Sequence, residues 1–295
     1  MVLKRGRYYL GRVVKINLTQ DALMDALVQA PTITIGKFDW TITDVVDSRE
    51  GDLKYIFGKL SKFAKDGHVT VIDEENRSQV DADAPNLLVA SSPFVYLPEF
   101  SGMAFLHVWD GIQEDVFPRR IQKIVEAAYD GLLVSCEVEP VADYRAFTSR
   151  LKRLSKFIEF SATVYPPNPL FGRLWAELNN YIGERNASEV SIKEQTSKPN
   201  GLKSKIIELM DKIILDRGYQ PEAVPGIADA AILMAADGYG KGKVIGVEDG
   251  EEVVIKTSDT QKSFLFSKDP LPAEFAEKAR VYLGRVSIER DMGHR

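Results

Sequence analysis

The chain has 295 residues, enough for one large domain or two moderate ones, and its 44% hydrophobic and 27% charged residues are usual for a globular protein. The formal net charge of -5 excludes a protein that is basic throughout, although it leaves room for a local basic surface. The single cysteine, Cys136, excludes an internal disulfide and a cysteine-based zinc site. Because it lies in an apolar run, we expect a buried thiol.

The composition also predicts where the protein resides and what it lacks. The basic N-terminus is not followed by the apolar stretch of a secretory signal, and no run approaches the roughly 18 apolar residues of a membrane span. The three histidines are scattered along the chain. We therefore expect a cytoplasmic protein with no membrane span, no bound metal and no cofactor.

Residues 1–85 have the features of a strand-rich N-terminal domain. β-Branched and aromatic residues recur in several short runs, and Thr19 or Asp21 can cap a short helix over residues 22–28. The acidic segment 73–84 has no clear periodicity and is expected to be a solvated loop between two structural units. Strands are predicted at 7–17, 32–46, 54–63 and 68–72.

Residues 86–200 are predicted to form a central α+β domain. A hairpin is expected over 86–109, followed by helix, strand, helix and strand over 116–128, 132–139, 144–156 and 157–165. The last two strands alternate apolar and polar residues, which is typical of a largely antiparallel sheet that helices cover on one face. The polar stretch 188–202 is the best candidate for a mobile link.

Residues 201–295 are predicted to form a helical region with one β-hairpin. Amphipathic patterns indicate helices at 203–215, 227–236 and 272–282. The hairpin is expected over 244–256, with a further short strand at 264–266.

A glycine- and lysine-rich run follows the helix predicted at 227–236. Glycines allow backbone amides to approach a phosphate, and lysines neutralise its charge. However, Val244 stands where a P-loop has Ser or Thr, and a helix precedes the run where a dinucleotide motif has a strand. A helix end that leads into a strand is the simpler interpretation, and a phosphate-contacting loop is the alternative. The candidate residues are Gly238, Gly240, Lys241, Gly242 and Lys243.

Three carboxylates, Glu137, Glu139 and Glu159, lie on the polar faces of two predicted strands. If those strands were neighbours, the carboxylates could bind a divalent metal, as a nuclease or a nucleotide-processing enzyme requires. Solvated glutamates on an exposed sheet face are the simpler interpretation. We find no nucleophile motif, so these residues are the only catalytic candidates.

The two central helices carry basic residues away from their apolar stripes. If both helices lay on the same side of one sheet, the cations would form a continuous plate that binds phosphate backbone without reading bases. A basic helix face that only keeps the protein in solution is the alternative. The candidate nucleic-acid-binding residues are Arg119, Arg120, Lys123, Arg145, Arg150, Lys152, Arg153 and Lys156.

The segment from Ser92-Pro93-Phe94-Val95-Tyr96-Leu97 to Tyr165-Pro166-Pro167-Asn168-Pro169 supports a family resemblance. Its layout resembles that of uncharacterised bacterial and prophage proteins linked to phage defence. In order of elements it also resembles the lambda exclusion protein RexA and, more distantly, the KwaB component of the Kiwa system. The resemblance implies a non-enzymatic, DNA-binding, dimeric defence protein. It covers residues 7–215 as a pattern of elements and transfers no functional residue.

Together these observations predict a nucleic-acid-binding sensor or regulatory protein of a bacterial antiphage system. We expect it to bind nucleic acid, with DNA as the expected type, through phosphate contacts, and to pair with a second copy or with another defence protein. A metal-dependent nuclease or nucleotide-processing enzyme that uses the three glutamates is one alternative. A structural subunit that binds only protein is another.

Overall fold

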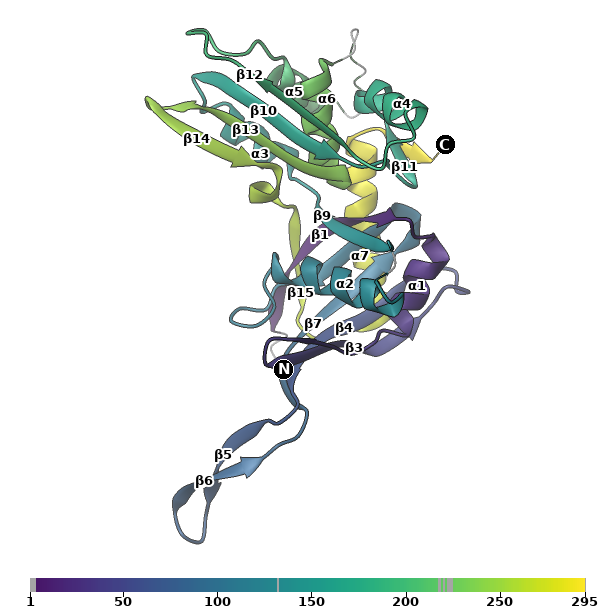
Figure 1. The fold of residues 1–295 in the computed structure, drawn as a ribbon, viewed down its shortest axis with the longest axis vertical. Helices are drawn as coiled ribbons and strands as arrows, with labels where there is room; N and C mark the ends of the chain where they lie inside the picture. Colours follow the sequence, from purple (N-terminus) through teal and green to yellow (C-terminus); the bar gives the residue numbers. More distant parts are fainter. Residues whose placement is uncertain (1–3, 132, 217–218, 220, 222–224, 295) are drawn as a thin grey trace.

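The computed structural model describes residues 4–131, 133–216, 219, 221 and 225–294. Two β-sheet layers lie one above the other in Figure 1, and a two-stranded arm projects from the lower layer. All strand pairs within the described residues are antiparallel. The protein therefore has the α+β fold that its sequence predicts.

The lower layer is built on the large sheet, with strand order β15-β1-β8-β7-β4-β3-β2 and β9 paired with the second half of β1. Cys136 in β9 is buried, as predicted. The strands are β1 (Arg5–Ile16), β2 (Ile33–Ile35), β3 (Phe38–Asp47), β4 (Ile56–Ala64), β7 (Leu87–Leu97), β8 (Gly102–Leu106), β9 (Ser135–Pro140) and β15 (Ser263–Ser267).

Helices cover both faces of the large sheet. On one face lie α1 (Gln20–Val28), which Thr19 caps, and α2 (Val116–Ala128), whose Phe117 stacks on Phe105 of β8 with ring centroids 4.2 Å apart. On the other face lies α7 (Pro272–Glu289), where the ring of Phe275 packs against that of Tyr8 of β1 with ring centroids 4.6 Å apart. Burial of these aromatic rings contributes much of the hydrophobic stabilisation of this layer.

The upper layer is built on the small sheet, which helices cover on one face only. Its strand order is β12-β10-β13-β14, and Phe160 and Ala162 of β10 are buried towards α6. The elements are α3 (Tyr144–Leu151), β10 (Lys156–Val164), α4 (Ala176–Glu184), β12 (Val190–Gln195), α5 (Ile206–Leu215), α6 (Ile227–Met234), β13 (Gly240–Glu248) and β14 (Glu251–Lys256). The opposite face of this sheet carries polar side chains.

Short elements complete the chain. A π-helical turn, Ala235–Tyr239, connects α6 to β13, and the 3₁₀ turn Thr257–Thr260 follows β14. Two further 3₁₀ turns span Pro98–Phe100 and Arg173–Trp175, and β11 (Leu170–Gly172) pairs with β16 (Met292–His294). Among the described residues, no helix is both long and apolar enough to cross a membrane.

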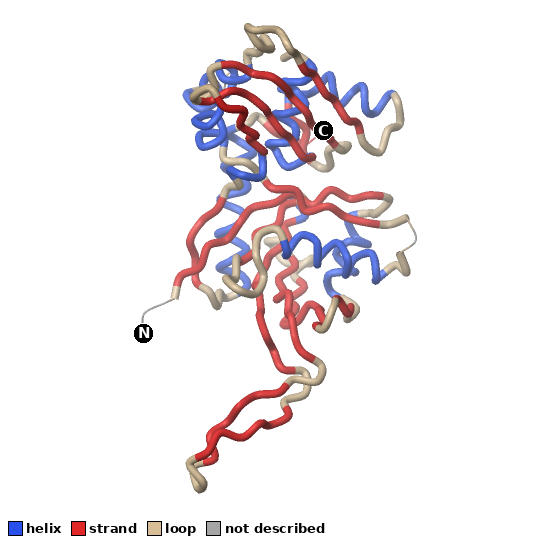
Figure 2. The backbone as a smooth tube through the Cα atoms, turned by 60° about the vertical axis from the view of Figure 1, so that its left-hand side comes forward, coloured by secondary structure: helices blue, strands red, loops and turns tan. Residues whose placement is uncertain are grey.

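The projecting arm is a hairpin of β5 (His68–Asp73) and β6 (Ser78–Asp83), seen at the bottom of Figures 1 and 2. Strand β5 is where the sequence predicts one. The prediction of a loop over residues 73–84 is wrong, because Ser78–Asp83 pairs along the whole length of β5. Val80 and Ala82 are the only apolar residues of β6, and hydrogen bonding to β5 stabilises the strand despite this low apolar content.

The sheets do not follow the predicted boundaries at residues 85 and 200. Strands β7, β8 and β9 pair with strands of the N-terminal segment, and the chain returns to the large sheet only with β15. The predicted link at 188–202 contains β12, the edge strand of the small sheet. The helix predicted at 144–156 ends already at Leu151, and Lys156 is the first residue of β10. Leu132, where the sequence predicts the start of β9, lies outside the described residues.

Candidate functional site

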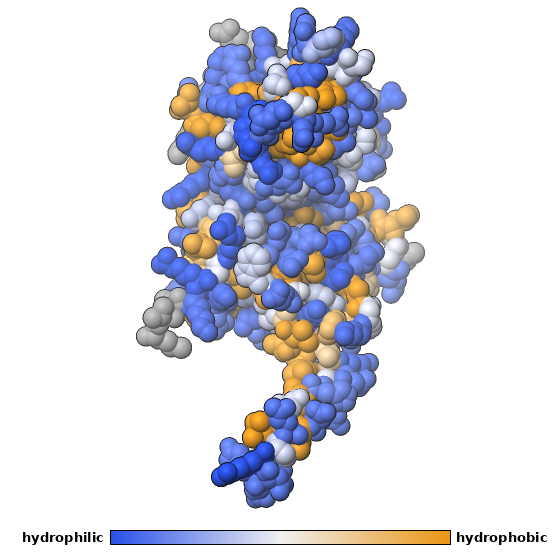
Figure 3. Space-filling view, turned by 90° about the vertical axis from the view of Figure 1, so that its left-hand side faces the viewer, coloured by the Kyte–Doolittle hydropathy of each residue, from blue (hydrophilic) through white to orange (hydrophobic). Residues whose placement is uncertain are grey.

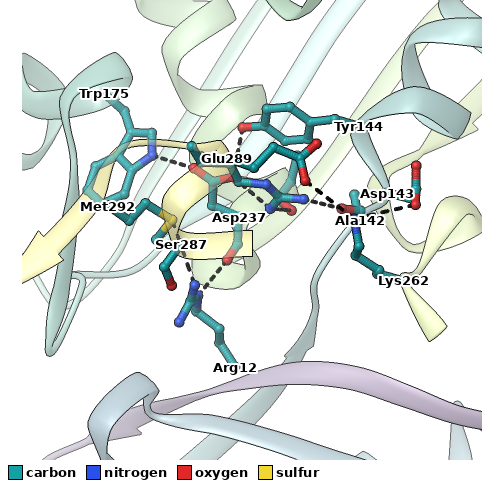
Figure 4. A network of polar contacts seen from close by, with 12 residues as sticks. Arg12, Ala142, Asp143, Tyr144, Trp175, Asp237, Lys262, Ser287, Glu289 and Met292 are labelled. Carbon is teal, nitrogen blue, oxygen red and sulfur yellow. Dashed lines mark hydrogen bonds and ion pairs between the residues drawn. The ribbon is translucent and has the colours of Figure 1, made fainter. Parts of the chain in front are cut away.

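A buried polar network holds the two layers together (Figure 4). Its centre is Asp237 in the π-helical turn, whose Oδ1 accepts hydrogen bonds from Arg290 at 2.8 Å and Tyr144 at 2.7 Å. Trp175 donates to Asp237 Oδ2 at 2.8 Å. From the large sheet, Arg12 donates to the Asp237 carbonyl oxygen at 2.8 Å and to the Phe100 carbonyl oxygen at 2.7 Å.

The members of this network are sealed from solvent. Arg12 and Asp237 are 0% exposed, and Arg290 is 1% exposed. Burial, followed by the negative charge of Asp237, raises the pKa of Tyr144 well above its ordinary value. Such groups are inaccessible to a macromolecular ligand, so the network positions the layers and is not itself the candidate site.

Beside this network, a cleft of about 1070 Å³ separates the layers. Lys241, Lys243, Ser161 and Thr163 of the small sheet line one wall. The opposite wall comes from β1, β9 and α2 and includes Arg7, Tyr9, Arg119, Glu137 and Glu139. The turn after β14 closes one side with Thr257, Ser258, Asp259 and Gln261. The cleft therefore has charged groups on both walls.

A row of lysines crosses the open face of the small sheet. Ser161 pairs with Lys193 of β12 on one side and with Lys243 of β13 on the other, and Lys243 in turn pairs with Lys256 of β14. Directly paired residues of antiparallel strands point to the same face, so the three lysines and the hydroxyl lie in one line. We call Lys193, Lys243 and Lys256 the lysine row.

One carboxylate neutralises part of the lysine row. Glu159 Oε2 lies 2.9 Å from Lys193 Nζ, and Glu159 Oε1 lies 2.8 Å from Lys243 Nζ. Hydrogen bonds from Lys243 and Lys193 lower the pKa of Glu159. Lys256 has no carboxylate within ion-pair distance among the described residues, although it stands directly opposite Lys243. Like charges at paired positions destabilise a sheet, so this end of the row favours an added anion.

The other glutamates meet Lys241 across the cleft. Lys241 Nζ lies 3.4 Å from Glu137 Oε2 and 3.3 Å from Glu139 Oε1. Glu139 is 1% exposed, and its burial raises the pKa of the carboxyl to about 7, despite the opposing effect of Lys241. At neutral pH the Glu139 carboxyl can therefore either accept or donate a proton.

The three sequence-predicted glutamates do not form one metal site. Glu137 and Glu139 are on β9 of the large sheet, whereas Glu159 is on β10 of the small sheet, and each of the three contacts a lysine. In the described part of the chain, no group of three or more histidine, cysteine or acidic residues is arranged to hold a metal ion. The premise that these strands are neighbours is wrong, because β9 pairs with β1.

The continuous cationic plate expected on the two central helices does not form. Helix α2 packs on the large sheet and α3 packs beside α5 in the other layer. Most of the cations also have acidic partners: Arg119 with Asp115, Lys123 with Glu126, Arg150 with Asp259, Lys152 with Asp211, and Arg153 with Glu248.

The remaining helix cations have different environments. The guanidinium carbon of Arg120 lies 4.8 Å from the centroid of the Trp40 ring. Burial lowers the pKa of Arg120. Lys156 is the first residue of β10, and Arg145 is exposed on α3. The eight predicted residues are therefore distributed over two layers and several faces.

The glycine-rich run ends one element and begins the next, as its simpler interpretation predicts. Gly238 has φ +88°, and a Cβ there would lie 2.9 Å from Arg12 Cγ, so this position favours glycine for conformation and for space. Gly240, Lys241, Gly242 and Lys243 belong to β13 and line the cleft. The run does not form a phosphate-binding loop, but it delivers two lysines to the cleft wall.

Lys193 and Lys256 were not identified from the sequence as site residues. Lys193 lies in the segment predicted to be a link, and Lys256 ends a hairpin strand. Their alternation with apolar residues places each on a polar strand face. Only the strand order of the small sheet puts both in line with Lys243.

Comparison with known proteins adds a family but no activity. Residues 21–208 match the family described as "Domain of unknown function (DUF4747)". The chain belongs to the DUF4747 family. The match runs from α1 through β9 to α5 and so includes Glu137, Glu139 and Glu159, but not β13 or β14. A search of curated proteins found no match.

Proposed function

We propose that this DUF4747 protein binds the phosphate backbone of nucleic acid, without base readout, on the open face of the small sheet and in the adjoining cleft. The observation that carries the proposal is the lysine row, above all the direct pairing of Lys243 with Lys256. A phosphate beside these two ammonium groups would relieve their repulsion. The proposal moves the interface from the helices predicted by the sequence to the sheet.

The dimensions of the row favour a polyanion over a small phosphorylated ligand. Neighbouring strands lie about 4.8 Å apart, so a row across four strands extends roughly 14 Å. A nucleic-acid strand presents successive phosphates along such a length, whereas one phosphate can contact one or two lysines. Ser161 and Ser258 offer hydroxyl donors beside the row and the cleft, and Arg7 adds a positive charge from the opposite wall.

The biological setting remains the one that the resemblance implies. The protein would be a cytoplasmic sensor or regulatory partner in a bacterial antiphage defence system, with DNA as the expected nucleic acid. The phosphate contacts proposed here carry no sequence information, which suits recognition of any invading genome.

The test compares two double variants by fluorescence anisotropy with a labelled DNA duplex at low salt. Lys193→Gln with Lys256→Gln removes two charges from the row and leaves Lys243 to neutralise Glu159. We expect the affinity to fall roughly 10- to 100-fold, since each lost phosphate contact removes one increment of counterion release.

The matched control is Arg150→Gln with Lys152→Gln, which removes two charges near the end of α3. Both residues already pair with acidic side chains, so a small effect on affinity is expected. Loss of binding in this control, with full binding by the lysine-row variant, would return the interface to the helices and refute its location on the sheet.

A hydrolytic enzyme is the second candidate, and Glu139 is the reason. A buried carboxyl with a pKa near 7 beside a lysine, in a large cleft, has the properties of a general acid or base. A divalent metal at Glu137 and Glu139 would have to displace Lys241. Incubation of plasmid DNA and of RNA with Mg²⁺ or Mn²⁺ tests this candidate, and equal cleavage by the wild type and Glu139→Gln would eliminate it.

A further inference from the structure

The arm formed by β5 and β6 extends the β4–β7 hairpin away from the body (Figures 1 and 2). Two backbone hydrogen bonds connect the hairpin and the arm, from Ala84 N to the Gly67 carbonyl oxygen at 2.7 Å and from Asn86 N to the Lys65 carbonyl oxygen at 3.1 Å. A Cβ at Gly67 would lie 2.4 Å from Leu87 Cβ, so glycine allows the two strands to bend closely here.

The two faces of the arm differ in character. Val69 pairs with Ala82 and Val71 pairs with Val80, which places four apolar side chains on one face. We call these four residues the apolar face of the arm. The other face is mainly polar and carries one exposed apolar side chain, Ile72. On that face His68 contacts Asp83 at 2.8 Å, and Thr70 donates a hydrogen bond to Asp81 at 3.2 Å.

The apolar face of the arm has little cover within the chain. Val71 is 42% exposed and Val80 is 41% exposed, and neither belongs to the two hydrophobic cores. Figure 3 shows hydrophobic atoms along the arm and at its base. An isolated two-stranded ribbon is at best marginally stable in water, so a stable arm needs a partner on this face.

The charges on the arm and at its base are complementary. Glu74 and Glu75 occupy the tip, and six acidic residues stand against a single arginine in residues 66–84. At the base, Lys37 and Lys65 are exposed and make no ion pair among the described residues. The acidic tip of one arm therefore matches the basic base of another.

We propose that the arm is a dimerisation element whose partner is a second copy of this chain. The apolar faces of two arms pack against each other in antiparallel orientation, and each tip lies at the base of the other molecule. This arrangement is self-complementary, as a two-fold interface must be. The exposed Leu88 and Val89 at the base enlarge the contact, because one short ribbon face supplies less than the roughly 800 Å² per partner of a standard interface.

Sedimentation-velocity ultracentrifugation of the full chain across a range of protein concentrations tests the dimer. Val71→Asp with Val80→Asp places two charges on the apolar face and should yield monomers. Ile72→Asp with Gln79→Asp adds the same charges at the neighbouring paired position, on the opposite face of the same ribbon, and should leave the dimer intact. A wild type that is monomeric at every concentration, or a dimer that both variants retain, would overturn the proposal.

A charge exchange tests the antiparallel orientation. Lys37→Glu with Lys65→Glu, and separately Glu74→Lys with Glu75→Lys, should each shift the midpoint of dimerisation to at least several-fold higher protein concentration. Combining all four substitutions restores opposite charges at both ends and should recover dimerisation. If the combined variant loses as much dimerisation affinity as the two double variants lose together, the tips do not meet the bases. That result would refute the antiparallel arrangement.

Discussion

At the scale of single residues, the most informative contact is the one between Glu139 and Lys241. From the sequence, the glutamate is a candidate metal ligand of the alternative enzyme, and the lysine is a candidate residue of the alternative phosphate-contacting loop. Neither the metal site nor the phosphate loop is formed, yet Lys241 Nζ lies 3.3 Å from Glu139 Oε1. Their encounter depends on β9 crossing near β13, which no local pattern of residues reveals.

The protonation of Glu139 should be visible in the pH dependence of stability. Its pKa is raised from 4.5 to about 7 in the folded protein, so the folded state binds more protons than the unfolded state between these values. The stabilising contribution of the protonated carboxyl is complete below about pH 4.5 and is lost as the pH rises through about 7.

We therefore expect the stability advantage of the wild type over Glu139→Gln to decrease by roughly 2–3 kcal/mol between pH 5 and pH 8. Urea denaturation of both proteins at a series of pH values measures this difference. Parallel stability profiles for the two proteins would show that Glu139 titrates normally.

At the scale of elements, strong alternation in the sequence was sufficient to predict most strands. The first strand, the hairpin of β7 and β8, and β10 are confirmed near their predicted positions. The polar edge strands β6 and β12 were missed because hydrogen bonds to β5 and β10 stabilise them more than their own apolar content does. The end of α3 was also misplaced, since Lys152 and Arg153 are compatible with a helix.

The network around Asp237 connects several of these elements and should be costly to break. Asp237→Asn removes the only carboxylate that contacts Arg290 among the described residues and leaves that buried cation unpaired. We expect a loss of about 3–5 kcal/mol in the free energy of unfolding. Asp211→Asn, which breaks the more exposed pair with Lys152, is the control and should cost less than about 1 kcal/mol.

Chemical denaturation with two spectroscopic probes measures both values. A small effect of Asp237→Asn, similar to that of the control, would show that the layers do not depend on this carboxylate.

At the scale of the whole molecule, the fold class was predictable but the assembly of the layers was not. Three consecutive segments are the simplest interpretation of the sequence, whereas the large sheet pairs β1 with β15 near the other end of the chain. The candidate site has the same origin. Its lysines come from β12, β13 and β14, and only long-range pairing brings them into one row facing a cleft.

The central claim is that this row and its cleft bind the backbone of nucleic acid. The most direct measurement is the affinity of the wild type for a labelled DNA duplex across a salt series. We predict that the logarithm of the association constant falls linearly with the logarithm of the salt concentration. Each lost phosphate contact reduces the slope by roughly 0.9, so the slope should be shallower by about 2 in Lys193→Gln with Lys256→Gln. Absence of binding at low salt, or an identical slope in that variant, would contradict the account.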